Sequence, residues 1–199
     1  VVTLAAEETT VKMTATLTIG TESLTKVFNV VVPAEGAAVE AVIYETGFEA
    51  PDFTAATAYN NESAKLVGPA NFQWSILMGT PTTTSPLLGA QSVQMRWYTG
   101  KPNGYASTNF DVVDVTKVEF KAKAYSGTVL EVLISKDGGV TWISGQEYEL
   151  TTSSIDYTYN ILSSDLSGNF RIKFSLKTNS GRTDLAIDDV KIYGMVAPG

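Results

Sequence analysis

Apolar and polar residues alternate one for one in several short segments of this chain, and this pattern limits the possible folds more than any other feature. It is clearest in residues 93–98, 118–125 and 170–177. A period of two places successive side chains on opposite faces of a β-strand. Helical periodicity is nearly absent, and only residues 55–65 are ambiguous. The chain is therefore predicted to be all-β, and the turn residues between the segments predict a two-sheet sandwich.

Residues 11–32 form a predicted hairpin. Residues 11–19 and 24–32 have strand character, with one buried face, and Gly20 opens the turn between them. A lone hairpin is at best marginally stable in water, so another element is expected to cover its apolar face. The two predicted strands are rich in threonine, and the second ends with residues 25–33. With this ending, they resemble the last two strands of bacterial immunoglobulin-like domains. The alternative is that the hairpin belongs to the sandwich that follows.

The immunoglobulin-like resemblance implies a domain order. Residues 1–33 are then the C-terminal strands of such a domain, whose other strands precede Val1 in a longer protein. Residues 34–39 are interpreted as a short linker, and residues 40–199 as the sandwich itself.

Composition limits the chemistry of the chain. It has 199 residues with no histidine and no cysteine, which excludes the commonest general base, a thiol nucleophile, disulfides and most zinc sites. Any metal must be bound by oxygen. A formal net charge of −7 argues against a surface that coats nucleic acid, although a local basic face is compatible with it. The N-terminus lacks signal-peptide features, and no segment is apolar enough to insert into a membrane.

An ordered set of segments resembles a jelly-roll accessory module of the kind that includes carbohydrate-binding and MAM-like domains of bacterial secreted enzymes. The segments are residues 47–49, 91–96, 118–123, 132–142 and 187–190. The resemblance implies a non-catalytic module of a secreted or surface protein, attached to other domains of the same polypeptide. Its expected ligand is a glycan or another extracellular polymer. The alternative is a structural spacer or protein-interaction module of a secreted hydrolase or nuclease.

The same resemblance implies a structural calcium ion between the first and last strands. In many such modules the ligands are a glutamate of the first motif, an aspartate of the last and backbone carbonyls, which assigns Glu49 and Asp188 in this chain. Calcium takes six to eight hard oxygen ligands in a flexible geometry. The alternative is that Asp188 and Asp189 are solvated at a strand end.

The residues themselves predict an irregularity at this aspartate pair. Apolar residues occupy odd positions up to Ile187 and even positions from Val190 onward, so the buried face changes across Asp188 and Asp189. A change of parity within one strand indicates a β-bulge or a strand edge.

Two places are candidates for ligand binding. Three predicted strands carry outward-facing cations and tyrosines. If these strands share a sheet, the side chains form a basic, aromatic face. Such a face suits an acidic polysaccharide or DNA as ligand. The candidate ligand-binding residues are Arg96, Tyr98, Lys121, Lys123, Arg171 and Lys173. The alternative is that these side chains only keep the strands soluble. The second candidate is the polar loop 79–89 with Trp74 and Tyr105.

Motifs for catalysis are missing. Residues 135–142 match the Asp-box pattern of sialidase propellers, but the motif occurs once, and we interpret it as a hairpin in which Asp137 caps the turn. No nucleophile elbow, phosphate loop or dinucleotide fingerprint is present. A glycosidase needs two carboxylates in one cleft, and the acidic pairs at 111/114, 147/149 and 188/189 are candidates only by their proximity in sequence. The chain is therefore predicted not to be an enzyme.

Overall fold

The computed structural model describes residues 9–32, 36–59, 63–84, 89–124, 128–161, 168–177 and 183–197. All regular structure within these residues is β, and the described part of the ambiguous stretch 55–65 contains no helix. None of the described residues belongs to a helix long and apolar enough to cross a bilayer. The chain divides into two compact units, Val1–Glu40 with Met195–Gly199 and Ala41–Gly194.

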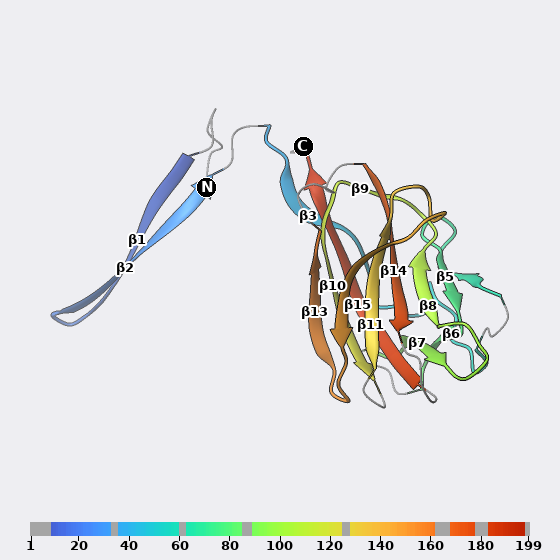
Figure 1. Ribbon diagram of the computed structural model, residues 1–199. Helices are drawn as coiled ribbons and strands as arrows, with labels where there is room; N and C mark the ends of the chain where they lie inside the picture. The colour runs from blue at the N-terminus through green and yellow to red at the C-terminus, as the bar shows by residue number, and fades with distance from the viewer. Residues whose placement is uncertain are drawn as a thin grey trace. The chain divides into compact units, whose positions relative to one another are not determined.

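The first unit contains the predicted hairpin. Strands β1 (Thr9–Ile19) and β2 (Glu22–Val32) pair antiparallel along their whole length (Figure 1). The expected alternation is present, and the apolar side chains of the hairpin are exposed, because a two-stranded sheet has no second layer of its own. Met13 is 51% exposed, Leu24 is 73% exposed and Phe28 is 45% exposed. The immunoglobulin-like assignment stays a prediction.

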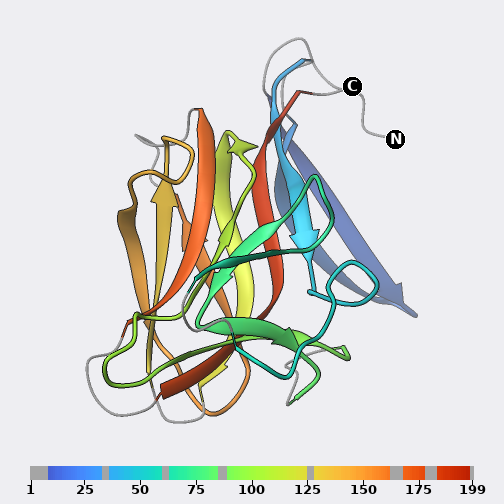
Figure 2. The same ribbon diagram turned by 90° about the vertical axis from the view of Figure 1, so that its right-hand side faces the viewer.

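The second unit is a sandwich of two sheets (Figure 1 and Figure 2). The first sheet has the order β13-β10-β15-β7-β6, with β3 beside β15. Its strands are β3 (Val39–Thr46), β6 (Gly79–Thr82), β7 (Ser92–Trp97), β10 (Val115–Ala124), β13 (Ile155–Asn160) and β15 (Thr183–Val196).

The second sheet has the order β12-β11-β14-β8-β5-β4, with β9 beside β14. Its strands are β4 (Lys65–Val67), β5 (Trp74–Leu77), β8 (Tyr105–Thr108), β9 (Val112–Val113), β11 (Val129–Ser135), β12 (Ile143–Glu149) and β14 (Asn169–Lys177). The predicted all-β, jelly-roll sandwich is confirmed.

The core lies between the inner faces of the two sheets. The alternating apolar residues of the three segments that defined the pattern are buried there as predicted, including Val93, Met95, Val118, Phe120, Phe170, Ile172, Phe174 and Leu176. Trp74 is 0% exposed and lies at the centre of an aromatic group. Its ring stacks on Phe174 at 6.1 Å and meets Phe48 edge-on at 5.1 Å, and its indole nitrogen donates to Tyr44 Oη at 2.8 Å.

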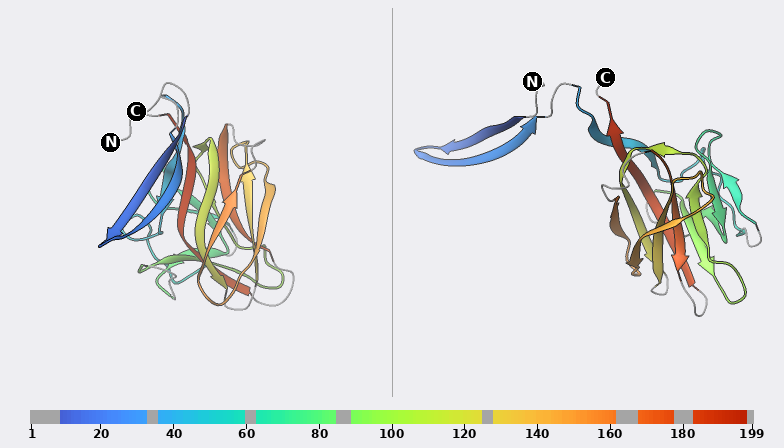
Figure 3. Two further views of the ribbon diagram at one scale, coloured as in Figure 1. Left: turned by 90° about the vertical axis from the view of Figure 1, so that its left-hand side faces the viewer. Right: turned by 45° about the horizontal axis from the view of Figure 1, so that its top comes forward.

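The first and last strands of the sandwich lie side by side as predicted, because β3 pairs with β15 (Figure 3). The predicted bulge is also present in β15. Glu119 pairs with Lys191 and Lys121 with Asp188, so two steps along β10 correspond to three along β15. Asp189, whose φ is 47°, is the extra residue of this bulge. This left-handed residue changes the phase of the strand, which explains the change of parity in the sequence.

Candidate functional site

Glu49, the glutamate of the predicted calcium site, is not on a strand. Strand β3 ends at Thr46, and the chain turns at Phe48, whose φ is 56°, before it reaches Glu49. Oε1 of Glu49 accepts hydrogen bonds from the backbone N–H groups of Ala90 at 2.9 Å and Gln91 at 3.4 Å. Glu49 therefore ties the segment after β3 to the segment before β7, a contact that the sequence did not indicate.

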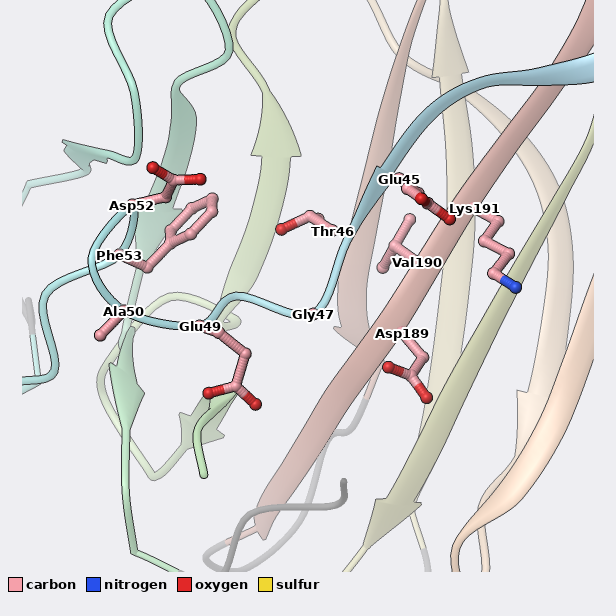
Figure 4. A pocket seen from close by; sticks show the side chains of 10 residues that line it. All are labelled: Glu45, Thr46, Gly47, Glu49, Ala50, Asp52, Phe53, Asp189, Val190 and Lys191. Carbon is pink, nitrogen blue, oxygen red and sulfur yellow. The ribbon is translucent and has the colours of Figure 1, made fainter. Parts of the chain in front are cut away.

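The carboxylates of the two aspartates and Cγ of Glu49 nevertheless lie around Gly47, while the Glu49 carboxylate is directed toward Gly89 and Ala90. A methyl group built on Gly47 would lie 3.6 Å from Cγ of Glu49, 3.6 Å from Oδ1 of Asp189 and 3.8 Å from Oδ1 of Asp188. The side chain of Asp188 is 0% exposed, and its Oδ1 accepts the N–H of Asp189 at 2.9 Å. The alternative in which both aspartates are solvated is therefore wrong for Asp188. Figure 4 shows Glu49 and Asp189 on neighbouring segments either side of Gly47.

A hollow of about 340 Å³ opens beside this junction (Figure 4). Its charged lining consists of Glu45, Glu49, Asp52, Asp189 and Lys191. Within the part of the chain that the structure describes, no group of three or more acidic side chains has the arrangement of a metal site.

The six predicted ligand-binding residues do not form one face. Arg96, Tyr98, Lys121 and Lys123 are on or directly after strands of the first sheet, whereas Arg171 and Lys173 are on β14 of the second sheet. The outward faces of the two sheets of a sandwich point in opposite directions. The prediction of a single basic face is therefore wrong. Alternation shows which side chains point outward, but it does not show which strands share a sheet.

On the first sheet the cations are already partnered. Nζ of Lys121 lies 2.8 Å from a carboxylate oxygen of Asp156 and 3.4 Å from one of Asp189. The hydrogen bond to Asp156 raises the pKa of Lys121. The Arg96 guanidinium lies 4.0 Å from the centroid of the Tyr59 ring, within the segment that follows β3. This face combines both signs of charge and is not a basic face.

On the second sheet a lysine lies against two aromatic rings. Nζ of Lys173 is 3.9 Å from the centroid of Trp142 and 4.8 Å from that of Tyr105. All three side chains are half-buried. Burial of the ammonium lowers the pKa of Lys173 to about 8. We call Trp142, Lys173 and Tyr105 the Lys173 cluster.

Trp142 is positioned by the Asp-box turn. The Ser135 hydroxyl donates to Asp137 Oδ1 at 2.7 Å, and the N–H of Thr141 donates to the same oxygen at 2.9 Å. These bonds, with the Thr141 hydroxyl as the largest contribution, lower the pKa of Asp137 to about 2. The predicted capping role of Asp137 is confirmed. Because Trp142 directly follows this fixed turn, its ring is presented to β14 in a defined orientation.

Arg171 lies next to the Lys173 cluster. A methyl group on Gly139 would be 3.5 Å from Cζ2 of Trp142 and 3.6 Å from Nη1 of Arg171, so these two side chains flank the same glycine. Nε of Arg171 forms an ion pair with Asp111 at 2.7 Å, and Nη1 donates to Asn109 at 3.4 Å. Arg171 is thus a second cation beside Trp142, and its guanidinium is held in place.

The second sequence candidate, the loop 79–89, is only partly a loop. Its first four residues form strand β6, which is buried, and residues 85–88 lie outside the described residues. Trp74 belongs to the core and is wrong as a binding residue. Tyr105 is on the outer face and is part of the Lys173 cluster. Sequence reasoning did not place Trp142 beside Lys173, because its Asp-box was interpreted only as a turn.

Comparisons with known proteins show a likeness of fold. No protein-family model and no curated protein sequence matches the chain. The K3 cleaved adhesin domain of Lys-gingipain from Porphyromonas gingivalis superposes with a TM-score of 0.53 at 16% identity, covering 78% of this chain and 99% of that domain. The family 29 carbohydrate-binding module CBM29-2 superposes with a TM-score of 0.50 in its mannohexaose complex, at 14% identity, covering 79% of this chain and 92% of the module. Its cellulohexaose complex gives the same TM-score at 13% identity, covering 80% and 92%.

Proposed function

We propose that the sandwich is a non-catalytic module that binds a polysaccharide through the Lys173 cluster. The observation that carries this proposal is the pair of half-exposed aromatic rings, Trp142 and Tyr105, held on either side of Lys173 on the outer face of the second sheet. A fixed aromatic ring offers a large apolar surface for the C–H face of a sugar at little cost in conformational entropy. Trp142 is also flanked by Val140, 80% exposed, and Ile143, 55% exposed.

The comparisons support this choice of ligand class. The module CBM29-2, which shares the fold, is complexed with mannohexaose and with cellulohexaose. An adhesin domain of similar fold supports the extracellular part of the proposal, a module of a secreted or surface bacterial protein with other domains attached. The formal charge of −7 disfavours nucleic acid as the ligand.

The non-catalytic part of the proposal is supported by the state of the acidic residues. The sequence contains no histidine to act as a general base. Asp111 is paired with Arg171 at 2.7 Å and Glu147 with Lys177 at 2.5 Å, so neither carboxylate is available as an unpaired acid or base.

Trp142→Ala is expected to weaken polysaccharide binding at least tenfold, because truncation of an aromatic anchor costs about 2 kcal/mol or more. Affinity electrophoresis in gels that contain neutral and acidic polysaccharides, followed by calorimetry, measures the loss. Tyr98→Ala is the matched control, since Tyr98 follows β7 of the other sheet. Equal loss in both variants, or loss only in Tyr98→Ala, would contradict the assignment to the Lys173 cluster.

The alternative function, a structural spacer or protein-interaction module, is favoured by the hairpin. The apolar row of β1 and β2 is exposed, with Leu17 at 60% and Leu24 at 73%, and such a row is suited to cover by another layer of protein. An immunoglobulin-like domain completed by other strands of a longer polypeptide provides that layer. Absence of retention on every polysaccharide tested, with Trp142 intact, would favour this alternative.

The calcium ion is a second part of the proposal. Asp188 and Glu49 are its side-chain ligands, with backbone carbonyls near Gly47, and its role is structural. The support is the buried carboxylate of Asp188 and the position of the Asp188, Asp189 and Glu49 side chains around Gly47. A buried carboxylate is costly unless a cation or hydrogen bonds compensate its charge. Bound calcium adds to the hydrogen bond that Asp188 accepts from Asp189 and links the segment after β3 to β15.

Removal of calcium is expected to lower the melting temperature by about 5–10 °C. The basis is that a ligand at about 100 times its dissociation constant adds about 2.7 kcal/mol to the free energy of unfolding. Differential scanning calorimetry with calcium and with chelator measures the shift. In Asp188→Asn the response to chelator is expected to disappear. An unchanged midpoint in the original protein would count against the ion.

A further inference from the structure

We propose that the Lys173 cluster selects sugar residues that carry a carboxylate group, so that the ligand of this module is an acidic polysaccharide. This inference rests on the proposed function, because it assigns a ligand class to the same cluster. It depends on the charges around Lys173 and not on the aromatic rings alone.

Nζ of Lys173 has no hydrogen bond and no ion pair with any of the described residues; its close contacts are the faces of Trp142 and Tyr105. Its cross-strand neighbours are uncharged, with Leu133 on β11 and Ser107 on β8. An ammonium group has three N–H donors. Because no described oxygen accepts from Nζ, the N–H donors that are not directed at the two rings are available to a ligand that approaches the outer face.

The acidic side chains of the surrounding strands are engaged elsewhere. Nζ of Lys177 lies 3.8 Å from a carboxylate oxygen of Glu131 on β11 and 2.5 Å from one of Glu147 on β12. Asp111 pairs with Arg171, the other cation of β14 that lies beside Trp142. In the adjoining turn, Asp137 is bound by Thr141. Lys173 is thus a cation whose neighbouring acids each have another partner.

This arrangement favours an anionic ligand over a neutral one. Burial beside the two rings removes water from the ammonium, which lowers the pKa of Lys173, and no described carboxylate is paired with it. A carboxylate that reaches Nζ restores the compensation through a charge-assisted hydrogen bond, which is about twice as strong as a neutral one. The sugar ring that carries it then packs on Trp142 or Tyr105. A neutral sugar gains the packing but supplies no charge-assisted hydrogen bond to the ammonium.

The first sheet shows the contrast. There Lys121 is neutralised by Asp156 and Asp189, and Lys117 by Glu119 at 3.2 Å. An anion that approached either lysine would have to displace a carboxylate of the protein. Lys173 requires no such displacement, and this difference assigns the acidic ligand to the second sheet.

The test compares two polymers that differ only in the carboxylate. Calorimetry with the full chain measures binding to polygalacturonate and to the same polymer after complete methyl esterification, at equal ionic strength. We expect the carboxylate form to bind at least about tenfold more tightly, the factor for one charge-assisted hydrogen bond. In Lys173→Met, which keeps an unbranched side chain but removes the ammonium group, this preference is expected to vanish. Lys123→Ala on the first sheet removes an equal charge and is expected to keep it.

Binding of polygalacturonate is also expected to depend on pH in a defined direction. The ammonium of Lys173 is charged below its pKa of about 8 and loses its proton above it. At pH 9.0 only about one tenth of the molecules keep the charge, so affinity is expected to be about tenfold weaker than at pH 6.5. Carboxylates and guanidinium groups keep their charges across this range. Lys173→Arg stays charged and is expected to bind equally well at both pH values.

Each outcome decides between the two proposals. Equal binding of the acidic and esterified polymers, with loss in Trp142→Ala, overturns the selection for carboxylate and leaves the proposed function intact. No binding of either polymer or of any neutral polysaccharide overturns both. Tighter binding of dextran sulfate or of single-stranded DNA than of polygalacturonate also overturns the assignment to carboxylate. A pH profile that is unchanged in Lys173→Arg shows that another group carries the dependence.

Discussion

Trp74→Ala is expected to lower the free energy of unfolding by about 4 kcal/mol, because loss of a buried tryptophan removes its burial energy and leaves a cavity. Trp74 is 0% exposed, and its ring contacts Phe48 and Phe174. The substitution also leaves Tyr44 without the indole donor. Urea unfolding followed by circular dichroism measures the change.

Trp142→Ala is the matched control for this prediction. The same substitution at the half-buried Trp142 is expected to cost much less stability while it weakens polysaccharide binding. The two tryptophans thus separate the core from the binding face. If Trp142→Ala were as destabilising as Trp74→Ala, the Lys173 cluster would be part of the stabilising core and its role in ligand binding would lose support.

Gly104→Ala is expected to lower the free energy of unfolding by about 3 kcal/mol, at the upper end of the cost of overpacking. A methyl group on Gly104 would lie 2.7 Å from the carbonyl oxygen of Arg96 and 3.1 Å from that of Met78, and these backbone atoms cannot rotate away. The carbonyl of Gly104 also accepts the N–H of Leu176 at 2.9 Å. Gly104 therefore allows β7 of the first sheet and β14 of the second to approach each other.

Gly100→Ala is the control for this prediction, because it tests backbone strain without a clash. Gly100 has φ of 82°, and a methyl group there meets nothing within 4 Å. We expect a loss of about 1 kcal/mol from the left-handed backbone alone. Chemical unfolding of both variants under the same conditions gives the difference. A Gly104→Ala protein no less stable than Gly100→Ala would contradict the close approach of the two sheets.

Local periodicity was sufficient to predict strands and their buried faces. Phe120 and Phe174 point into the core, and Lys121 and Lys173 point outward, because successive side chains of a strand must alternate. The same rule predicted the bulge at Asp189 from a change of parity. These features depend on neighbours in sequence, which is why the sequence alone could predict them.

The composition of the binding surface could not be predicted in this way. Lys121 and Lys173 have the same pattern of neighbours in sequence, yet one is paired with two aspartates and the other lies against Trp142 and Tyr105. Partners on adjacent strands come from distant parts of the chain. Their identity depends on which strands pair, and the alternation of a single strand carries no information about that.

The sequence by itself determined that this chain forms β-strands with defined inner and outer faces, a hairpin, an Asp-box turn and a bulge at the aspartate pair. Only the tertiary structure decided that Trp74 is core and Trp142 is surface, that Glu49 bonds to the segment before β7, and that the outward cations are divided between two sheets. The physical reason is that backbone geometry is local, whereas burial and charge compensation depend on strands brought together by long-range pairing.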